Sequence, residues 1–311
     1  MMTDTQIIPT TPESVFLTGA AGGLGREVTR RLVAAGYRVT GAGSGSADAV
    51  KVRAAGGIPA YPNLYRAGEL RSVMIGAGAK IVINLAPQLP NHVPQVAAQW
   101  DEQLAEATTA LMEASAQAGV EYVIHTSYAF ADARDDDAKA VLRATRAAER
   151  VALNGSVPAC VLRFGFLYGG ESDELIQLRD TLRTGRPVLA GPDDTHAQWV
   201  HITDAARAVM LAVEQRPTGT LFNIVDDQPV SPAAFLNHFV DSLGFSLASG
   251  LPQFALRRML PKAQLAILNL NTHADNTAAK ETLGWKPRFT SYKQGIEDTL
   301  LSWRAQEPVV S

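Results

Sequence analysis

The sequence predicts an α/β fold, a doubly wound parallel sheet followed by a smaller C-terminal α/β lobe. Short apolar runs alternate with longer helical patterns between residues 15 and 163, as expected for strands buried between two layers of helices. Beyond Arg163 the alternation loosens into segments interrupted by glycine and proline. Of the 311 residues, 46% are hydrophobic and 19% charged, which is typical of a soluble globular protein.

Six strand patterns account for the predicted sheet, at 15–18, 36–40, 58–61, 80–85, 122–126 and 159–163. Helical patterns lie between most of them, at 26–35, 68–77, 93–118 and about 137–153. The C-terminal lobe is predicted to hold helices at 173–184 and 203–215, a strand at 220–225, a helix ending at Leu243 and a last helix at 292–303. Ser231 is expected to cap the helix that ends at Leu243, with Pro232 in its first turn.

A glycine-rich turn, Thr-Gly-Ala-Ala-Gly-Gly-Leu-Gly at 18–25, joins the first strand to the first helix. Glycine lets the backbone come close to a pyrophosphate, and free N–H groups at the helix start attract its charge. The turn therefore predicts a dinucleotide site, although a tight turn without a ligand is the simpler alternative. The expected contacts come from Gly19, Ala21, Gly22, Gly23, Leu24 and Gly25.

Charge and cysteine content exclude several other classes of function. The net charge is -3 and no basic block occurs, so the sequence does not favour nucleic acid or an anionic membrane as a partner. The single cysteine, Cys160, lies in an apolar strand pattern and has no partner for an internal disulfide, which fits a cytoplasmic protein. The acidic run at 135–137 is expected to serve a helix N-terminus, and no metal site is predicted.

Several further motifs are similar to those of one large family. They are Asn84-Leu85-Ala86-Pro87, Thr126-Ser127, Leu162-Arg163 leading to Tyr168-Gly169, the run 199–204, Phe222-Asn223-Ile224, and Leu283-Gly284-Trp285-Lys286-Pro287. With the glycine turn, they make the chain resemble the extended short-chain dehydrogenase/reductase superfamily, which includes NAD-dependent epimerases and dehydratases. The resemblance implies a Rossmann fold that binds NAD(P), with cofactor contacts from Leu85, Ala86, Pro87 and Thr126, and a substrate cleft beneath the C-terminal lobe.

The resemblance also implies a domain division. Residues 1–13 are expected to form a flexible tail, 14–165 the dinucleotide-binding Rossmann domain, and 166–311 mainly the substrate-binding lobe. Segments near 195–225 are candidates to return to the first domain. The apolar run 251–270 is expected to be a helix pair of the lobe, because Pro252, Pro261 and Lys262 interrupt it.

The chain departs from the family at its catalytic helix. The family uses a tyrosine and, four residues later, a lysine; alignment places Val141 and Thr145 there, and a shift by one residue offers Leu142 and Arg146. The third catalytic member is retained as Ser127, and Tyr128 is the nearest substitute acid, with a packing role as its alternative. His125, His201 and Asp204 are expected to be structural, Asp204 as a cap or first-turn charge.

Two departures concern the cofactor. NAD-binding relatives carry a carboxylate at the end of the second strand, about 20 residues after the last glycine, where this chain has Gly43. Hydroxyls of Ser44 and Ser46, with Lys51 or Arg53, are candidate donors to a 2′-phosphate, so the sequence leans slightly to NADP. On the adenine side, Asn63 replaces the usual aspartate, with Leu64 beside it.

The substrate region lacks the polar residues of sugar-nucleotide enzymes. Phe166 stands where these usually have an asparagine, and Ala197-Gln198 where they have an arginine-aspartate pair. Phe164, Phe166 and Trp199 are therefore predicted to wall an apolar cleft, with a role in the core as the alternative.

The sequence thus favours an atypical NAD(P)-dependent oxidoreductase that transfers hydride to a small or partly apolar non-nucleotide substrate. The main alternative is a catalytically weak NAD(P)-binding redox sensor, and a sugar-nucleotide epimerase or dehydratase is less favoured. The resemblance also implies that the helices at 93–118 and about 137–153 pair in a homodimer.

Overall fold

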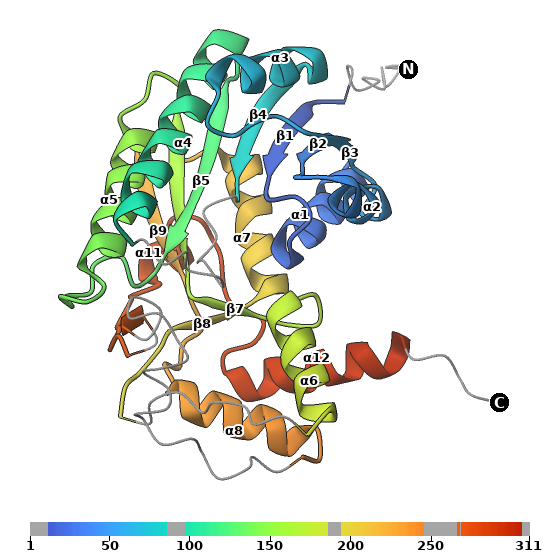
Figure 1. The fold of residues 1–311 in the computed structure, drawn as a ribbon, viewed down its shortest axis with the longest axis vertical. Helices are drawn as coiled ribbons and strands as arrows, with labels where there is room; N and C mark the ends of the chain where they lie inside the picture. The colour runs from blue at the N-terminus through green and yellow to red at the C-terminus, as the bar shows by residue number, and fades with distance from the viewer. Residues whose placement is uncertain (1–11, 86–96, 186–193, 246–265, 268, 307–311) are drawn as a thin grey trace, which may run out of the picture.

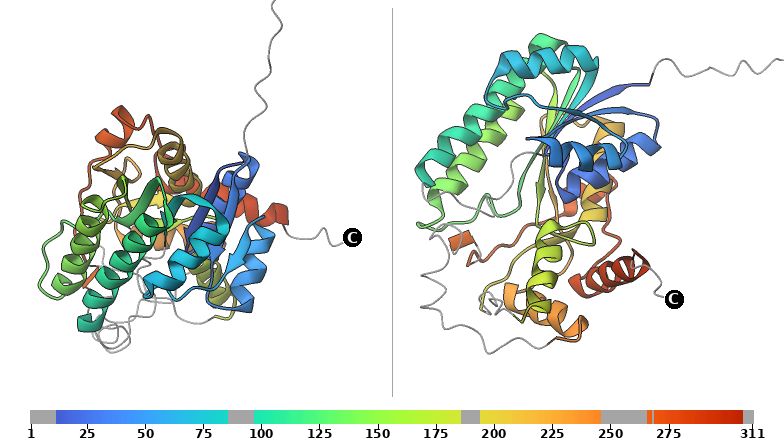
Figure 2. Two further views of the ribbon diagram at one scale, coloured as in Figure 1. Left: turned by 90° about the horizontal axis from the view of Figure 1, so that it is seen from above. Right: turned by 45° about the vertical axis from the view of Figure 1, so that its right-hand side comes forward.

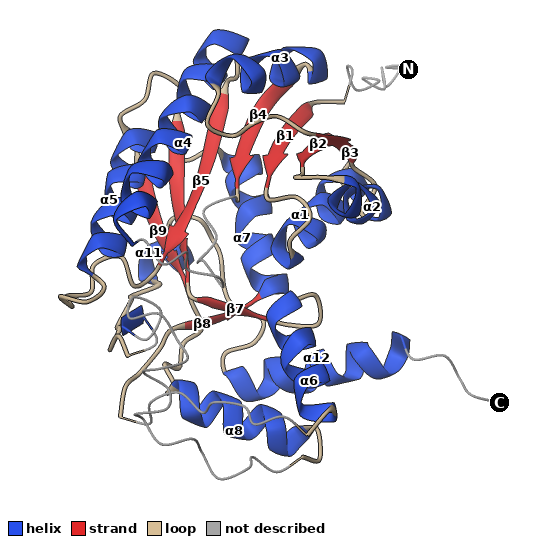
Figure 3. Cartoon of the chain, in the orientation of Figure 1, coloured by secondary structure: helices blue, strands red, loops and turns tan. Residues whose placement is uncertain are grey.

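The main sheet is parallel and has seven strands in the order β3-β2-β1-β4-β5-β6-β9. The computed structural model describes residues 12–85, 97–185, 194–245, 266–267 and 269–306, without the side chains of 97–103. The strands are β1 (Ser14–Thr18), β2 (Arg38–Ala42), β3 (Ile58–Ala60), β4 (Ala79–Asn84), β5 (Tyr122–Tyr128), β6 (Ala159–Phe164) and β9 (Thr220–Ile224). Figures 1 and 3 show their arrowheads pointing toward a smaller lobe. The predicted doubly wound parallel sheet is thereby confirmed.

Helices cover both faces of this sheet, as Figure 2 shows. The helices α3 (Ala67–Ala77), α4 (Ala97–Ala118) and α5 (Lys139–Leu153) pack on one face, around a core that includes Met74, Leu111 and Val123. The helices α1 (Gly23–Ala34) and α7 (Ile202–Gln215) pack on the other face around a separate core, to which α2 (Ser46–Ala54) contributes Val52. A strand such as β1, with all five residues buried, needs apolar partners on both sides.

The seventh strand goes beyond the six that were predicted, because the strand expected at 220–225 joins the main sheet, as the open candidate for segments near 195–225 allowed. β9 pairs with β6 from Cys160↔Thr220 to Phe164↔Ile224. α7 precedes it and packs closely on α1, because its alanines at 205, 206, 208 and 212 are fully buried and occupy little space. Cys160 is buried in β6, as predicted.

The smaller lobe is built around a two-stranded parallel sheet of β7 (Phe166–Tyr168) and β8 (Trp199–His201). Its helices are α6 (Asp173–Arg183), α8 (Pro232–Ser242) and α12 (Tyr292–Gln306), whose apolar faces share a core of their own with Tyr168. Ser231 caps α8 as predicted, since its hydroxyl accepts a 3.1 Å hydrogen bond from the Ala234 N–H, with Pro232 in the first turn.

Asp204 ties the C-terminal segment to α7. It lies in the first turn of that helix, and its carboxylate accepts the backbone N–H groups of Arg288 and Phe289 at 2.8–3.0 Å. The short helix α11 (Thr277–Glu281) leads into the same segment, in which Trp285 is fully buried. His201 is the N-cap of α7, because its Nδ1 accepts from the Thr203 N–H at 3.2 Å.

One helix boundary and one whole helix near the site differ from the prediction. The helix expected from about Asp137 begins at Lys139, and the Asp135 carboxylate accepts the Ala138 N–H just before it. The helix α2 was not predicted, because its mixed sequence carries little apolar periodicity. It begins at Ser46, so the glycine-serine loop after β2 is short. The expected helix pair at 251–270 lies largely outside the described residues.

Candidate functional site

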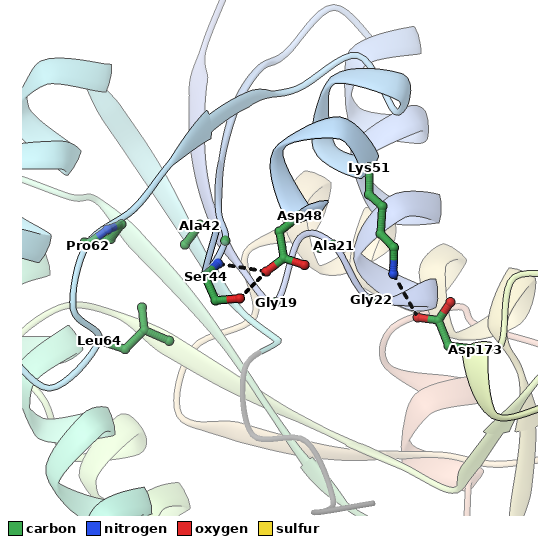
Figure 4. Close-up of a pocket in the computed structure, with 11 residues that line it drawn as sticks. Gly19, Ala21, Gly22, Ala42, Ser44, Asp48, Lys51, Pro62, Leu64 and Asp173 are labelled. Carbon is green, nitrogen blue, oxygen red and sulfur yellow. Dashed lines mark hydrogen bonds and ion pairs between the residues drawn. The ribbon is translucent and has the colours of Figure 1, made fainter. Parts of the chain in front are cut away.

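A pocket of about 380 Å³ lies at the carboxyl ends of β1 and β2, where a parallel sheet normally binds its ligand (Figure 4). Three loops, the end of β2 and the helices α2 and α6 form it. The described lining residues are Gly19, Ala21, Gly22, Ala42, Gly43, Ser44, Asp48, Lys51, Pro62, Leu64 and Asp173. Of the predicted cofactor contacts, the structure therefore brings Gly19, Ala21, Gly22, Ser44 and Leu64 together around one space.

The glycine turn requires its glycines for steric reasons. Gly19 has φ +66°, a left-handed conformation that side chains disfavour. A Cβ on Gly25 would lie 2.1 Å from the Gly19 carbonyl oxygen, and one on Gly23 would lie 2.2 Å from the Glu171 carbonyl oxygen. Gly22 is the N-cap of α1, and Leu24 points into the core. The turn thus presents bare backbone and a helix N-terminus to the pocket, which suits a pyrophosphate.

Arg26 fastens this turn to the second lobe, a role that the sequence analysis missed. Its guanidinium donates to the Ala21 carbonyl at 2.7 Å and to the Glu171 carbonyl at 2.8 Å. It also forms ion pairs with the carboxylates of Glu171 and Asp173 at 3.1 and 3.2 Å. Only its position after Gly25 could have drawn attention to it, since the acidic partners lie some 145 residues later.

A carboxylate that the sequence analysis also missed stands beside the end of β2. The Asp48 Oδ2 accepts the Ser44 N–H at 2.7 Å and the Ser44 hydroxyl at 2.6 Å (Figure 4). Both hydrogen bonds lower the pKa of Asp48, and the bond from the Ser44 hydroxyl has the larger effect. Lys51 forms an ion pair with Asp173 at 3.9 Å. Ser46 and Arg53 are not among the described lining residues.

The predicted adenine contact, Asn63, is exposed, and its side-chain oxygen accepts the Tyr65 N–H at 3.0 Å in a local turn. Its neighbour Leu64 lines the pocket while Asn63 is absent from the described lining. Leu85 is buried just after β4, and Thr126 donates its hydroxyl to the Asn84 carbonyl at 2.8 Å. Ala86 and Pro87 lie outside the described residues.

Ser127 belongs to a buried charged network at the end of β5. Its hydroxyl donates to Glu149 Oε1 at 2.5 Å, and both residues are only 4% exposed. Arg163 completes the network, with two hydrogen bonds to Glu149 at 2.6 and 2.7 Å and an ion pair to Asp132. Contact of the Ser127 hydroxyl with a substrate would require an exchange of its bond to Glu149.

Tyr128 is packed against aromatic and aliphatic side chains. Its ring stacks on Phe130 with 5.0 Å between centroids, and Val141 and Leu142 belong to the same apolar cluster. Burial raises the pKa of Tyr128 well above its usual value, so the phenol stays protonated at neutral pH. On the neighbouring helix α5, the hydroxyl of Thr145 is bonded to the Val141 carbonyl and Arg146 donates to the Ala131 carbonyl.

The three predicted substrate contacts separate into two groups. Phe164 is buried in the main core of the sheet, whereas Phe166 and Trp199 are partly exposed and face each other with 5.4 Å between ring centroids. Phe166 also approaches Phe130 at 5.9 Å, and Trp199 stacks on Phe235 at 3.8 Å. A continuous series of aromatic rings thus leads from Tyr128 into the smaller lobe.

Both histidines that the sequence analysis assigned to structural roles are buried. Burial lowers the pKa of His125 and of His201 to about 4, so both are neutral at neutral pH. His125 Nδ1 lies 3.1 Å from the Asn84 amide nitrogen. The described residues contain no cluster of His, Cys, Asp and Glu suited to a metal ion, and no described helix is long and apolar enough to cross a membrane.

Comparison with known proteins identifies the family. The profile of the NAD-dependent epimerase/dehydratase family matches residues 15–225, which include the glycine turn and the whole main sheet. The chain belongs to the NAD-dependent epimerase/dehydratase family. The resemblance inferred from the motifs is thereby confirmed, and members of this family bind a nicotinamide cofactor.

Two curated relatives of this epimerase/dehydratase family member are named as reductases. One is a 3-diazoavenalumate denitrifying reductase of Streptomyces sp., 28% identical over 303 residues that cover 91% of this chain and 98% of the relative. The other is a 4-hydroxy-2-methyl-3-oxo-4-farnesyl-3,4-dihydroquinoline-1-oxide ketoreductase of Stigmatella aurantiaca, 24% identical, covering 91% and 94% of the two chains.

Solved epimerase and dehydratase structures share the fold. The dTDP-glucose 4,6-dehydratase DesIV of Streptomyces venezuelae, solved with NAD bound, superposes with a TM-score of 0.74 at 19% identity and covers 94% of this chain and 97% of its own. The UDP-glucose 4-epimerase of Thermotoga maritima gives a TM-score of 0.71 at 19% identity, covering 94% and 99%. These similarities establish the fold of this family member over nearly its whole length.

Proposed function

We propose that this protein is an NAD(P)-dependent oxidoreductase that transfers hydride to a small or partly apolar substrate without a nucleotide. The observation that carries the proposal is the open pocket around the glycine turn, at the carboxyl edge of the sheet. The partly exposed pair Phe166 and Trp199 supports an apolar substrate in the adjoining lobe.

The chain's own residues fit a dinucleotide. Gly19, Ala21 and Gly22 offer backbone to the pyrophosphate, and Arg26 holds their turn in place through the Ala21 carbonyl. When bound, the cofactor supplies the hydride acceptor or donor. Arg26 acts as a positioning residue, because its guanidinium reaches the turn from outside the described pocket lining.

A proton must accompany the hydride when a carbonyl is reduced to an alcohol. We propose that Tyr128 supplies this proton, because it follows Ser127 at the end of β5 and its phenol is protonated at neutral pH. Burial raises the pKa of the phenol and so makes it a weaker acid than the tyrosine that the family normally uses. Ser127 would orient the substrate oxygen after releasing Glu149. Val141 and Thr145 offer no acid at the family's usual positions, so water is the alternative proton source and the chemical step is expected to be slower.

The named relatives support the choice of substrate. Neither the 3-diazoavenalumate reductase nor the quinoline-1-oxide ketoreductase is named for a sugar nucleotide, and both are named as reductases. We therefore expect an unsaturated ring compound with a reducible carbonyl or nitrogen group, which would lie against the Phe166 and Trp199 rings.

The test is a titration of the purified protein with NADH and NADPH, followed by nicotinamide fluorescence. Oxidation of the bound cofactor is then measured with apolar ketones, quinones and enones. As a comparison, UDP-glucose is incubated with the NAD⁺-loaded protein and its conversion to an isomer is followed by product analysis, because epimerisation causes no net oxidation of the cofactor. Binding with turnover of an apolar compound is the expected result. Binding without any turnover would favour the redox sensor, and conversion of UDP-glucose alone would favour the epimerase.

Two variants test the assigned groups. Tyr128→Phe retains the ring stacking and removes the hydroxyl, so it is expected to lower kcat by about 10²-fold while NADH binding is unchanged. Phe130→Leu is the matched packing control, because it disturbs the same stack without removing a proton donor. Equal losses in both variants would assign Tyr128 to packing alone.

A further inference from the structure

The carboxylate beside β2 bears on a choice that the pocket must make between two cofactors. NADP differs from NAD by a phosphate on the 2′ position of the adenosine ribose. In a Rossmann fold, the region after β2 normally contacts this part of the ribose. We propose that Asp48, on helix α2, takes the place of the missing carboxylate at the end of β2 and makes the pocket selective for NAD. This inference rests on the proposed function, since it assumes that the pocket holds a nicotinamide dinucleotide.

Backbone packing brings Asp48 to this place. Gly43 carries no side chain, and a Cβ built on it would lie only 2.8 Å from the Asp48 Cβ. The side chain of Asp48 therefore fills the space that a side chain at position 43 would need. Glycine at position 43 thus leaves the room that the Asp48 side chain occupies. The sequence of β2 alone shows only the glycine and therefore indicates no carboxylate.

The hydrogen bonds of Ser44 argue against a phosphate site. Both of its donors, the backbone N–H and the hydroxyl, are directed at Asp48 Oδ2. The two groups that would otherwise bind a 2′-phosphate are thus already used by a carboxylate. Within the described part of the chain, Asp48 Oδ1 has no recorded hydrogen bond, so it can accept one from a ribose hydroxyl.

The charges around the pocket point the same way. The described lining contains one basic side chain, Lys51, and two acidic ones, Asp48 and Asp173. Lys51 is paired with Asp173 at 3.9 Å, on the side of the pocket away from Ser44 in Figure 4. A 2′-phosphate next to Asp48 would bring like charges together, whereas a ribose hydroxyl would gain a charged acceptor.

Asp48 also occupies the first turn of α2, so a purely structural role must be separated from selectivity. Asp48→Asn achieves this, because the amide oxygen can still accept from Ser44 while the charge is lost. The matched control is Glu69→Gln. Glu69 lies in the first turn of α3, accepts the Asn63 N–H at 2.9 Å through its carboxylate, and is not among the described lining residues.

The experiment measures dissociation constants of NADH and NADPH for the wild type and both variants by fluorescence titration, with 5′-AMP and 2′,5′-ADP as competitors that lack nicotinamide. We expect the wild type to bind NADH more tightly by on the order of 100-fold. Asp48→Asn should reduce this ratio at least tenfold, mainly by tighter NADPH binding, and Glu69→Gln should leave it unchanged. The preference should also weaken as salt is added.

Equal or tighter NADPH binding by the wild type would overturn the inference, and so would an unchanged ratio in Asp48→Asn. A parallel loss of affinity for both cofactors in that variant would assign Asp48 to capping only. Failure of the proposed function is a different result, because then neither NADH nor NADPH would bind the wild type.

Discussion

The indole Nε1 of Trp285 donates a 2.9 Å hydrogen bond to the backbone carbonyl of Asp204, 81 residues earlier in the chain. The Asp204 carboxylate in turn accepts the backbone N–H groups of Arg288 and Phe289. A single buried residue at the start of α7 therefore holds the C-terminal segment from two sides. Burial raises the pKa of Asp204 although the hydrogen bonds from Arg288 and Phe289 act to lower it, so desolvation is the larger effect at this carboxylate.

Asp204→Ala should lower the free energy of unfolding by about 3 kcal/mol, since it leaves the backbone N–H groups of Arg288 and of buried Phe289 without their acceptor. Asp204→Asn retains one acceptor oxygen and should lose less. Urea unfolding followed by tryptophan fluorescence measures both. Asp135→Ala, which removes only a bond to the Ala138 N–H, is the control and should cost no more than about 1 kcal/mol.

The buried network beneath β5 gives a second expectation. Glu149→Ala leaves the Arg163 guanidinium largely buried and paired only with the exposed Asp132, so we expect a loss of about 3–5 kcal/mol in unfolding free energy. Asp132→Ala should cost at most about 1 kcal/mol, because the Asp132 side chain is 71% exposed. Similar costs for the two variants would contradict the importance assigned to Glu149.

The glycine turn can be tested by its steric limits. Gly25→Ala would place a Cβ 2.1 Å from the Gly19 carbonyl oxygen, so the turn must shift; we expect loss of NADH binding and at least about 2 kcal/mol of stability. Gly68→Ala, in the first turn of α3 with no atom within 4 Å of its added Cβ, should leave binding unchanged and stability within about 1 kcal/mol. Retained NADH affinity in Gly25→Ala would show that the cofactor does not depend on this turn.

Buried histidines predict a dependence of stability on pH. The pKa of His125 is lowered to about 4 in the folded protein, against about 6.5 when unfolded. Between these pH values the unfolded chain binds the proton more strongly than the folded protein does. The contribution of His125 to the free energy of unfolding is therefore complete above about pH 6.5 and is lost as the pH falls toward 4. It amounts to about 3 kcal/mol for one such histidine.

His125→Asn should therefore flatten the fall in stability between pH 7.5 and pH 4.5, measured by urea unfolding at several pH values. His196→Asn is the control, because His196 is exposed. Burial raises the pKa of Asp226, so this group makes the protein more stable as the pH falls, opposite to the effect of His125. The wild-type pH profile combines both effects, and the comparison therefore uses variants. An unchanged slope in His125→Asn would show that this histidine is not the source.

Local sequence patterns predicted most of the fold and the glycine half of the site. Apolar runs such as Val15-Phe16-Leu17 identify strands, and the glycines identify the turn, because both depend on neighbouring residues. The place of β9 and the contacts of Arg26 depend on residues far away in the sequence. Asp48 was missed for a related reason, since α2 has weak periodicity and its carboxylate reaches the site only once that helix has formed.

Other expectations stay predictions. The homodimer through α4 and α5 is one of them. The catalytic roles of Ser127 and Tyr128 also stay predictions, because both side chains are buried, and the Tyr128→Phe variant tests the second of them.

The return of β9 to the main sheet has a consequence for anyone who divides this protein into fragments. A chain cut after residue 165 would lose both β9 and α7, so β6 would become an open edge and the apolar side chains of α1 would face water. Such a fragment offers a template for strand addition between molecules. The two lobes are therefore interleaved along the chain, and residues 14–165 expressed alone should form aggregates.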